Sequence, residues 1–157
     1  YAIVTSRIDY GNALLYGVSA SLIQKLQHIQ NIAARVVTRV GKFEHITPAL
    51  KSLHWLPVQE RVEFKILLLV YKALHGLAPT YLSDLLTPYQ PTRCLRSTAE
   101  KSLRVPSTKL VTCGDRAFSK SGPNLWNMLP LKIKQSKSVD AFKSALKAFL
   151  FRRAFGN

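Results

Sequence analysis

The side chains of this sequence that could bind a metal or transfer a proton are its histidines, cysteines and carboxylates. The four histidines and two cysteines do not have the spacing of metal ligands, and the sequence has no CxxC pair. Glu60 and Glu63 are about one helical turn apart, but the interleaved Arg61 and Lys65 favour a solvated ion-pair face over a catalytic carboxylate pair. The sequence also has no Asp-Asp pair for two-metal phosphoryl transfer and no Gly-rich phosphate loop. We therefore predict no catalytic centre, no metal site, no cofactor and no small-molecule substrate.

The charge of the chain indicates a polyanionic partner. Lys and Arg number 23 against 8 Asp and Glu, which gives a net charge of +15. Binding of such a chain to nucleic acid is favoured because each neutralised phosphate releases counterions. The charge is uneven, with 9 cations and 5 acids in residues 1–87 but 14 and 3 in residues 93–157. Solubility, or an excised piece whose acidic complement lies elsewhere, is the alternative explanation. We expect RNA and/or DNA as the partner.

Two groups of cations are the candidate nucleic-acid-binding residues. The first lies on a predicted helix, in a stretch without any acid between Asp9 and Glu44. A solvated helix face usually mixes signs, so this stretch indicates phosphate contact, with an ordinary solvated face as the alternative. Tyr89, beside the second group, is a possible base-stacking residue, but a packed or half-exposed loop aromatic is favoured. The first group is Lys25, Arg35 and Arg39, and the second is Arg93, Arg96, Lys101, Arg104 and Lys109.

Residues 55–76 predict the element around which the chain folds. Pro57 suits the first turn of a helix, and Gly76 suits its end. Residues 66–71 are apolar in every direction around the axis, which is typical of a core helix or a membrane span. The apolar run is far shorter than the roughly 20 residues that a bilayer requires. We therefore expect a core helix at 57–75, with Leu68 and Leu69 buried in it, and no membrane partner.

The other periodic segments predict further helices. One covers residues 1–16, although Gly11 interrupts it, and a second begins at Ser19 or Ser21 and ends near Val40 before Gly41. Short helices are expected at 47–53 and 80–86, and a last one begins at 138–139 and runs to about residue 154. The core stripe expected on the second helix is Leu22, Leu26, Ile29, Ala33, Val36, Val37 and Val40.

The C-terminal part has a different character. The prolines of residues 88–92 predict an extended connector that does not pair regularly, and we place a subdomain boundary there. Residues 102–106 alternate as a short strand would, Pro123 suits a helix start, and Trp126 suits a packed corner. The expected fold is mostly α: a helical bundle around helix 57–75 in subdomain 1–87, followed by a basic, partly irregular subdomain 93–157 with short strands and a final helix.

Five blocks of the sequence, which cover nearly the whole chain, carry a resemblance to a known family. They are SRIDYGNALLYG (6–17), LQHIQNIAARVVT (26–38), HITPALKSLHWLPVQERVEFKILLLVYKALHGLAPTYLSDLL (45–86), LRSTAEKSLRVPSTKL (95–110) and GDRAFSKSGPNLWNMLP (114–130). The chain resembles the C-terminal part of the polyprotein of non-LTR (LINE-type) retrotransposons, of the jockey and chicken-repeat kind. None of the blocks is a catalytic motif.

The resemblance implies the thumb-like helices and C-terminal domain that follow the fingers and palm of a reverse transcriptase. It implies that residues 1–87 are the thumb-like part and that the chain grips RNA template and DNA primer. The partners would be nucleic acid and the remainder of the polyprotein. The family's catalytic Tyr-Ala-Asp-Asp box is absent, so we expect no polymerase activity and no enzyme.

Other interpretations of the chain stay open. The start without Met indicates a fragment, and a non-functional genomic remnant is one alternative. Another is a structural module whose 139–154 helix docks onto the missing palm or onto another subunit. The sparse cysteines indicate an intracellular location, which the resemblance refines to the nucleus or a cytoplasmic ribonucleoprotein.

Overall fold

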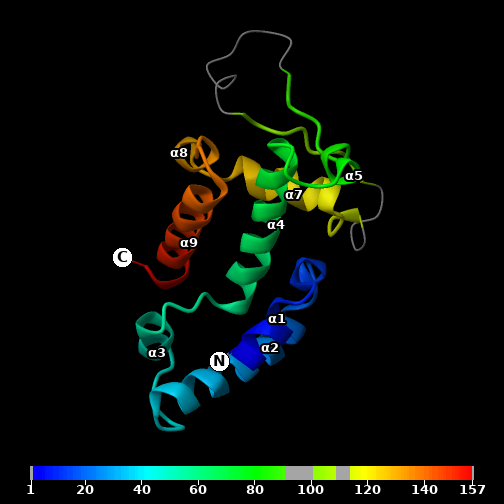
Figure 1. Cartoon of the computed structure of the whole chain (residues 1–157). Helices are drawn as coiled ribbons and strands as arrows, with labels where there is room; N and C mark the ends of the chain where they lie inside the picture. The colour runs from blue at the N-terminus through cyan, green and yellow to red at the C-terminus, as the bar shows by residue number, and fades with distance from the viewer. Residues whose placement is uncertain (1, 91–100, 109–113, 157) are drawn as a thin grey trace. The chain divides into compact units, whose positions relative to one another are not determined.

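A computed structural model describes residues 2–90, 101–108 and 114–156 of the chain (Figure 1). These residues are mostly helical, which confirms the α class. The contacts group the chain into two compact units: unit 1 comprises Tyr1–Phe64 and Lys147–Asn157, and unit 2 comprises Lys65–Leu146. The helices are α1 (Ala2–Asp9), η1 (Asn12–Leu15), α2 (Ala20–Thr38), α3 (Thr47–Ser52), α4 (Val58–Leu74), α5 (Thr80–Ser83), α7 (Phe118–Asn127), α8 (Leu131–Lys134) and α9 (Val139–Phe155). None of the helices in the described ranges combines the length and apolarity needed to cross a membrane.

The predicted subdomain boundary at 88–92 does not coincide with the boundaries between these two units. The two units divide within α4 and within α9, so each of these helices contributes residues to both units. The grouping describes contacts and does not test whether residues 1–87 and 93–157 fold separately. Residues 91 and 92 of the connector lie outside the described residues. The boundary at 88–92 therefore stays a prediction.

Unit 1 has a small core at the chain segment that leads into α4. Ala34 of α2, Leu50 of α3 and Trp55 are buried in it, and the half-buried apolar side chains against it are Ala33, Ile46, Leu53 and Phe155. Arg61 of α4 donates to Asp9 of α1, with Nε 2.8 Å from Oδ1 and Nη2 2.5 Å from Oδ2. This paired arginine connects two helices that are far apart in the sequence.

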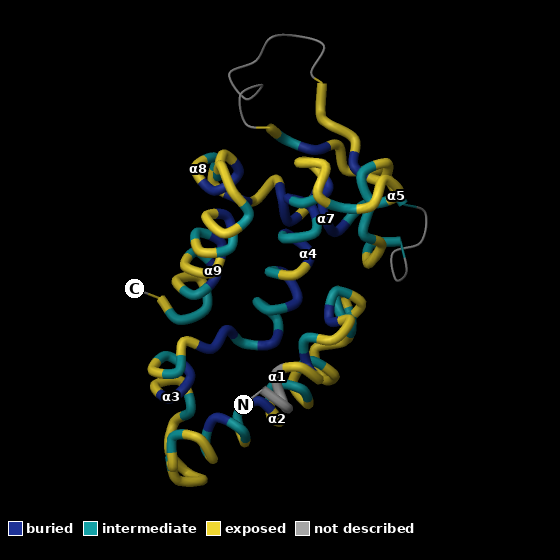
Figure 2. The backbone as a smooth tube through the Cα atoms, viewed as in Figure 1, coloured by how far each residue is buried: buried dark blue, intermediate teal, exposed yellow. Residues whose placement is uncertain are grey.

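The apolar stripe expected on α2 is not its core face. No member of that stripe is buried, whereas Gln30 is only 3% exposed. The reason is a polar clamp: Gln30 Nε2 donates to Leu56 O at 2.9 Å, and Val58 N donates to Gln27 Oε1 at 2.8 Å. The Val58 N–H belongs to the first turn of α4, where no acceptor within the helix can reach it. Satisfying these buried backbone groups turns the polar side of α2 inward and leaves apolar side chains exposed, namely Leu22, Ile29, Ile32, Val36 and Val37. Most of α2 is accordingly exposed or half-buried (Figure 2).

Several helix ends differ from the expected positions by a few residues. Gly11 adopts a left-handed conformation with φ of 61°, so α1 ends before it and a short 3-10 turn follows. The end of α2 falls at Arg39, whose φ is 57°, rather than at Gly41. The short helix α5 stops at Ser83, whereas α9 begins as predicted, with Ala141 N donating to Ser138 Oγ at 3.2 Å.

The predicted central helix is confirmed as α4. Its buried apolar residues are Val58, Val62, Ile66, Leu67, Val70, Tyr71 and Ala73. The expectation that Leu68 and Leu69 are buried is wrong, because both are only half-buried. An apolar run cannot show by itself which of its members face the neighbouring helices. The spacing of the buried residues, at i, i+4, i+8 and i+12, identifies that face.

Unit 2 is built on aromatic packing between the second half of α4 and the first part of α9. The rings of Tyr71 and Phe142 stack with centroids 4.2 Å apart, and Trp126 lies 6.1 Å from Phe142. Tyr71 Oη donates to Ser136 O at 2.8 Å, so the buried phenol is satisfied. Trp126 is 1% exposed, which confirms it as a packed anchor.

Helix α7 approaches α4 closely through Gly122. A Cβ at this position would lie 2.9 Å from Cγ2 of Val70, so only glycine permits this contact without a shift. Pro123 follows it inside the helix, five residues after the first residue Phe118, and does not start the helix as expected. It is also buried, and the helix continues past it to Asn127. The close packing of α7 on α4 thus decides where this helix lies.

The predicted strand at 102–106 is not formed, and no strand occurs in residues 2–90, 101–108 or 114–156. Leu103 and Pro88 form a single antiparallel bridge instead. Its two hydrogen bonds run from Tyr89 N to Ser102 O (2.9 Å) and from Arg104 N to Thr87 O (2.8 Å). Pro88 has no N–H, but it occupies the position between these bonds, where none is required. The connector therefore pairs at this one point and does not form a regular ladder.

Candidate nucleic-acid interface

The first predicted group of cations lies on α2 but is not uniformly open to solvent. Lys25 and Arg39 are exposed. Arg35 is half-buried and donates through Nη2 to Glu44 O at 2.7 Å and through Nη1 to Gly41 O. Because its guanidinium already binds two loop carbonyls, Arg35 closes the loop between α2 and α3. A phosphate contact on α2 therefore depends mainly on Lys25 and Arg39.

The surroundings of these cations on α2 are apolar. Lys25 and Ile32 are seven residues apart, so they lie along one side of the helix, and Arg39 caps its C-terminal end. Ile32 is 49% exposed, and the neighbouring Val36 is 74% exposed. An exposed apolar group offers nothing to a phosphate. This surface, which we call the α2 face, is defined by Lys25, Ile29, Ile32, Val36 and Arg39.

The second predicted group divides between described and undescribed residues. Arg93, Arg96 and Lys109 lie outside the described residues. Lys101 and Arg104 are exposed on the segment 101–108 of unit 2. The two cations lie three residues apart on this short segment. The structure says nothing about the other three.

Side chains of α7 hold this extended segment in place. Asn127 Nδ2 donates to Leu103 O, and Leu103 N donates to Asn127 Oδ1, both at 2.8 Å. The bridge to Pro88 does not use the N–H and C=O of Leu103. The Asn127 side chain binds both groups, as the backbone of a neighbouring strand would. Trp126 Nε1 donates to Lys101 O at 2.9 Å. Both α7 residues thereby fix the position from which the Lys101 side chain extends.

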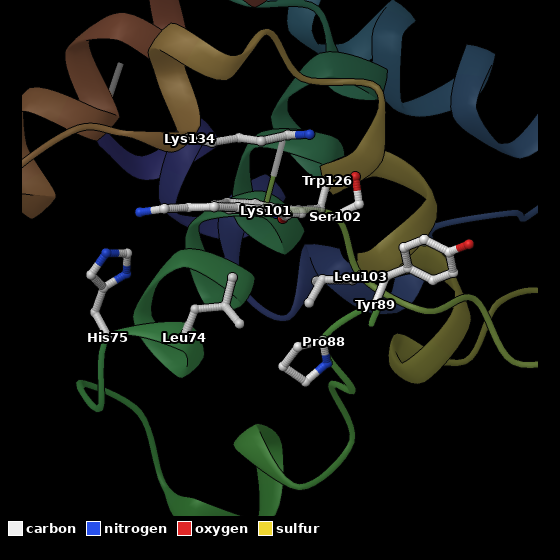
Figure 3. Close-up of a pocket in the computed structure, with 9 residues that line it drawn as sticks. All are labelled: Leu74, His75, Pro88, Tyr89, Lys101, Ser102, Leu103, Trp126 and Lys134. Carbon is white, nitrogen blue, oxygen red and sulfur yellow. The ribbon is translucent and has the colours of Figure 1, made fainter. Parts of the chain in front are cut away.

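A hollow of about 270 Å³ opens beside this segment in unit 2 (Figure 3). Its wall combines apolar side chains, rings and two lysines, namely Leu74, His75, Pro88, Tyr89, Lys101, Ser102, Leu103, Trp126 and Lys134. We call it the basic hollow. A second hollow of about 360 Å³ shares three residues with it (Tyr89, Ser102 and Leu103) and adds Arg104, Val105 and Asn127. The two hollows therefore adjoin along the bridged segment.

The charge of the basic hollow is positive. Lys134 of α8 is 3% exposed, and its Nζ lies 3.4 Å from Asn127 O, to which it donates. Lys101 is exposed and crosses the hollow in Figure 3. Neither Asp nor Glu is among the described residues that line either hollow. The exposed Lys101 ammonium beside this described wall favours an anionic ligand.

Acidic groups elsewhere in the chain are arranged differently. In unit 1, Arg153 Nη2 lies 2.5 Å from Glu63 Oε2 and 3.9 Å from Glu60 Oε1, and burial raises the pKa of the Glu60 carboxyl above its usual value. In unit 2, hydrogen bonds from Lys120 and from Thr108 lower the pKa of Asp115. Lys120 therefore already has a carboxylate partner.

Sequence reasoning missed several residues of the basic hollow. Lys134, Leu74, Pro88 and Leu103 come from separate elements, and no spacing in the sequence connects them. For Tyr89, the sequence favours a packed or half-exposed loop aromatic over a base-stacking residue. The structure leaves it 53% exposed, which confirms a half-exposed loop aromatic, and places it on both hollows. The one usable signal was the pair of basic residues Lys132 and Lys134 after Pro130, which does not distinguish the buried lysine from the exposed one.

No group of three or more His, Cys, Asp or Glu side chains is placed to hold a metal ion in the part of the chain that the structure describes. Cys94 and Cys113 lie outside that part. Comparison of the chain with models of known protein families, with curated proteins and with solved structures gave no match.

Proposed function

We propose that the chain is a non-catalytic nucleic-acid-binding fragment of a retrotransposon reverse transcriptase, which grips RNA template and DNA primer. The observation that carries the proposal is the basic hollow and its neighbour, where the exposed cations Lys101 and Arg104 lie beside a partly apolar wall. Phosphates are bound by such cations, and unpaired bases by such walls. The net charge of +15 supports the same class of partner.

The resemblance is the reason for proposing a reverse transcriptase as the parent protein and RNA template and DNA primer as the nucleic acids. It connects this helical, basic chain with the region after the palm, in which no polymerase chemistry takes place. On this proposal the chain acts inside the cell, in the nucleus or in a cytoplasmic ribonucleoprotein, and the rest of the polyprotein is its second partner.

Salt dependence tests the proposal. A fluorescently labelled RNA template annealed to a DNA primer is titrated with the full chain at several salt concentrations. The logarithm of the affinity should fall linearly with the logarithm of the salt concentration, by about 0.7–0.9 for each phosphate neutralised. Affinity that does not change with salt would contradict the proposal. Extension of the primer, with Mg²⁺ and nucleotides present, above a no-protein control would contradict its non-catalytic part.

Docking onto another protein is the second candidate function, and the α2 face favours it. Ile29 and Ile32 are each 49% exposed on this face, next to cations and without an acid from residue 10 to residue 43. In the helix expected to dock, at 139–154, Phe142, Leu146 and Leu150 are each 0% exposed, while Phe149 and Phe151 are half-buried. On this candidate the α2 face, and not α9, contacts the palm or another subunit, and apolar contact would give little dependence on salt.

A further inference from the structure

We infer that the α2 face binds an amphipathic helix of a partner protein, and that this helix carries two carboxylates spaced to meet Lys25 and Arg39. The inference goes beyond nucleic-acid binding and does not depend on it. It rests on the docking candidate, the second candidate function, and names the secondary structure, the charge and the residue spacing of the partner.

The exposed residues of the α2 face have the spacing of a helix-pairing surface. Five residues follow one another along α2 at alternating steps of three and four, namely Leu22, Lys25, Ile29, Ile32 and Val36. All five are exposed. This spacing keeps them in one narrow row, and in coiled coils such a row packs between the side chains of a facing helix. The row extends over about four turns, or about 21 Å, so it is long enough to hold a helix.

Contacts on the other side of α2 fix the orientation that exposes this row. Gln27 Oε1 accepts a hydrogen bond from Val58 N. Gln30, which is 3% exposed, donates to Leu56 O. Ala34, which is 0% exposed, packs in the small core of unit 1. Rotating α2 to bury the row would break both hydrogen bonds and open this core. A partner therefore covers the row at a lower cost than a rotation of α2.

The charges of α2 determine which kind of helix fits the row. Lys25 lies within the row, and Arg39 caps the C-terminal end of α2. The ion pairs formed within the described ranges do not include either cation. The sequence has no Asp or Glu from residue 10 to residue 43. Carboxylates of a partner would pair with these cations beside an apolar contact that excludes water, which strengthens the attraction. The complementary helix is therefore acidic at these two points.

The positions of the two cations define the pattern expected in the partner. Lys25 and Arg39 are 14 residues apart. Between them the row contributes Ile29, Ile32 and Val36. A helix packed along the row therefore has two carboxylates about two heptads apart, with three apolar residues between them. This pattern is the same for a parallel and for an antiparallel partner. A charged pair within an apolar row also specifies how the two helices align.

Other occupants fit the row less well. A second copy of the chain would bring another α2, which has cations but no carboxylate to face Lys25. A nucleic-acid backbone would pair with the cations, but its phosphates gain nothing from the apolar groups between them. A lipid surface favours helices with Trp or Phe on the apolar side, and α2 contains no aromatic residue. Charge and side-chain type thus favour an acidic helix over each of these occupants.

The first test measures the binding of labelled synthetic peptides to the full chain by fluorescence anisotropy. The acidic peptide is a helix of about four heptads, with two Glu placed two heptads apart and three Leu or Ile in the row between them. One control peptide has Lys in place of both Glu, and the other has Ser in place of the three apolar residues. The acidic peptide should bind about tenfold more tightly than either control.

The second test substitutes exposed residues of unit 1. Ile32→Ser should weaken binding of the acidic peptide about tenfold. Val37→Ser should not, because Val37 has the same exposure of 49% but lies about 100° around the helix from Val36. Lys25→Glu should weaken binding of the acidic peptide about tenfold and strengthen binding of the Lys peptide. Lys147→Glu makes the same charge change at an exposed position of α9 and is the control. Circular dichroism establishes that each variant is folded.

The outcomes separate this inference from the proposed function. Equal binding of the three peptides, or equal effects of Ile32→Ser and Val37→Ser, would overturn the inference and leave nucleic-acid binding untouched. Displacement of the acidic peptide by the labelled template and primer would show that the row binds nucleic acid instead. Binding of the acidic peptide by a chain that does not bind the template and primer would support the inference and contradict the proposed function.

Two further measurements address the remaining occupants. Sedimentation velocity of the chain alone should show a monomer, and a dimer that Ile32→Ser abolishes would assign the row to a second copy. Vesicles of phosphatidylcholine and phosphatidylserine should not compete with the acidic peptide. Competition by these vesicles that Ile32→Ser abolishes would assign the row to lipid and overturn the inference.

Discussion

The two groups of predicted cations lie in opposite surroundings. On the α2 face, Lys25 and Arg39 share the surface with Ile32 and Val36, which are 49% and 74% exposed. At the basic hollow, the two lysines border a concave wall without a carboxylate among its described residues. The α2 face is a convex helix surface with apolar groups between its cations, while the hollow can enclose a ligand.

This difference shows what cation density alone leaves undetermined. The α2 helix lacks acids in its sequence, as does the described lining of the hollow, yet the cations of α2 are separated by apolar side chains, which are stabilised by removal from water. An exposed apolar surface flanked by cations is typical of protein docking. A hollow that combines a cation with a partly apolar wall is typical of a ligand site. The neighbours of a cation, and not the number of cations, therefore distinguish the two surfaces.

The largest expected effect contrasts the core with the α2 face. Leu67→Ala should lower the free energy of unfolding by about 2–5 kcal/mol, because Leu67 is 1% exposed. Val36→Ala should change the free energy of unfolding by no more than about 0.5 kcal/mol, because most of the Val36 surface is already in contact with water. Urea denaturation measures both. A loss at Val36 close to that at Leu67 would mean that the α2 face is covered in solution, and the comparison would then fail.

The next effect concerns the hydrogen bonds of Gln27 and Gln30 to the backbone at the start of α4, which orient α2. Gln30→Leu should lower the free energy of unfolding by about 1–3 kcal/mol, because Leu56 O then loses its donor inside the protein. Gln24→Leu, at an exposed position of the same helix, is the matched control and should change little. If Gln30→Leu stabilises the chain instead, the apolar stripe expected from the sequence is the core face after all.

Much of the helical fold was predictable because it depends on local periodicity. Pro57 and Gly76 bracketed α4 correctly, and Ser138 marked the start of α9. The orientation of α2 was not predictable, because it depends on two hydrogen bonds from Gln27 and Gln30 to a backbone about thirty residues away. A glutamine on a helix usually faces solvent, and its sequence neighbours do not show an unsatisfied amide elsewhere.

The candidate site was predictable only in part. The charge distribution predicts Lys101 and Arg104 as binding residues, and both are exposed in the structure. The hollow itself depends on α7 side chains that bind the backbone of residues 101–103. The same side chains explain the missing strand, since Asn127 takes the place of a second neighbouring strand. Such tertiary contacts override the alternating pattern from which a strand was expected.

A smaller effect compares the two groups of cations directly. Lys101→Gln combined with Arg104→Gln should reduce the salt slope for a single strand by about 1.4, if each cation neutralises one phosphate. Lys25→Gln combined with Arg39→Gln removes the same charge from the α2 face and should reduce the slope less. The measurement is affinity for the same labelled strand over a range of salt concentrations. If the α2 pair gives the larger change in slope, the α2 face and not the hollow contributes more to phosphate binding, which would contradict this prediction.

The smallest effect tests two carboxylates of unit 1, in contrast to the described lining of the hollow, which has none. Burial raises the pKa of Glu60 above its usual 4.5, although Arg153, 3.9 Å away, opposes the shift. Between 4.5 and the folded-state pKa, the folded chain therefore binds more protons than the unfolded chain, so stability falls as the pH rises through that window. Glu60→Gln cannot ionise. It should gain about 0.5 kcal/mol at neutral pH, and this gain should vanish as the pH is lowered toward 4.5.

Glu63→Gln supplies the control on the same helix and the same arginine. Glu63 Oε2 lies 2.5 Å from Arg153 Nη2, so removing its charge should lower the free energy of unfolding at neutral pH by about 1 kcal/mol, since the arginine is partly exposed. Urea denaturation at several pH values gives both results. The decisive comparison is the sign of the two changes at neutral pH. If Glu60→Gln loses stability as Glu63→Gln does, the Arg153 contact outweighs the burial of Glu60. Both glutamates then neutralise this arginine.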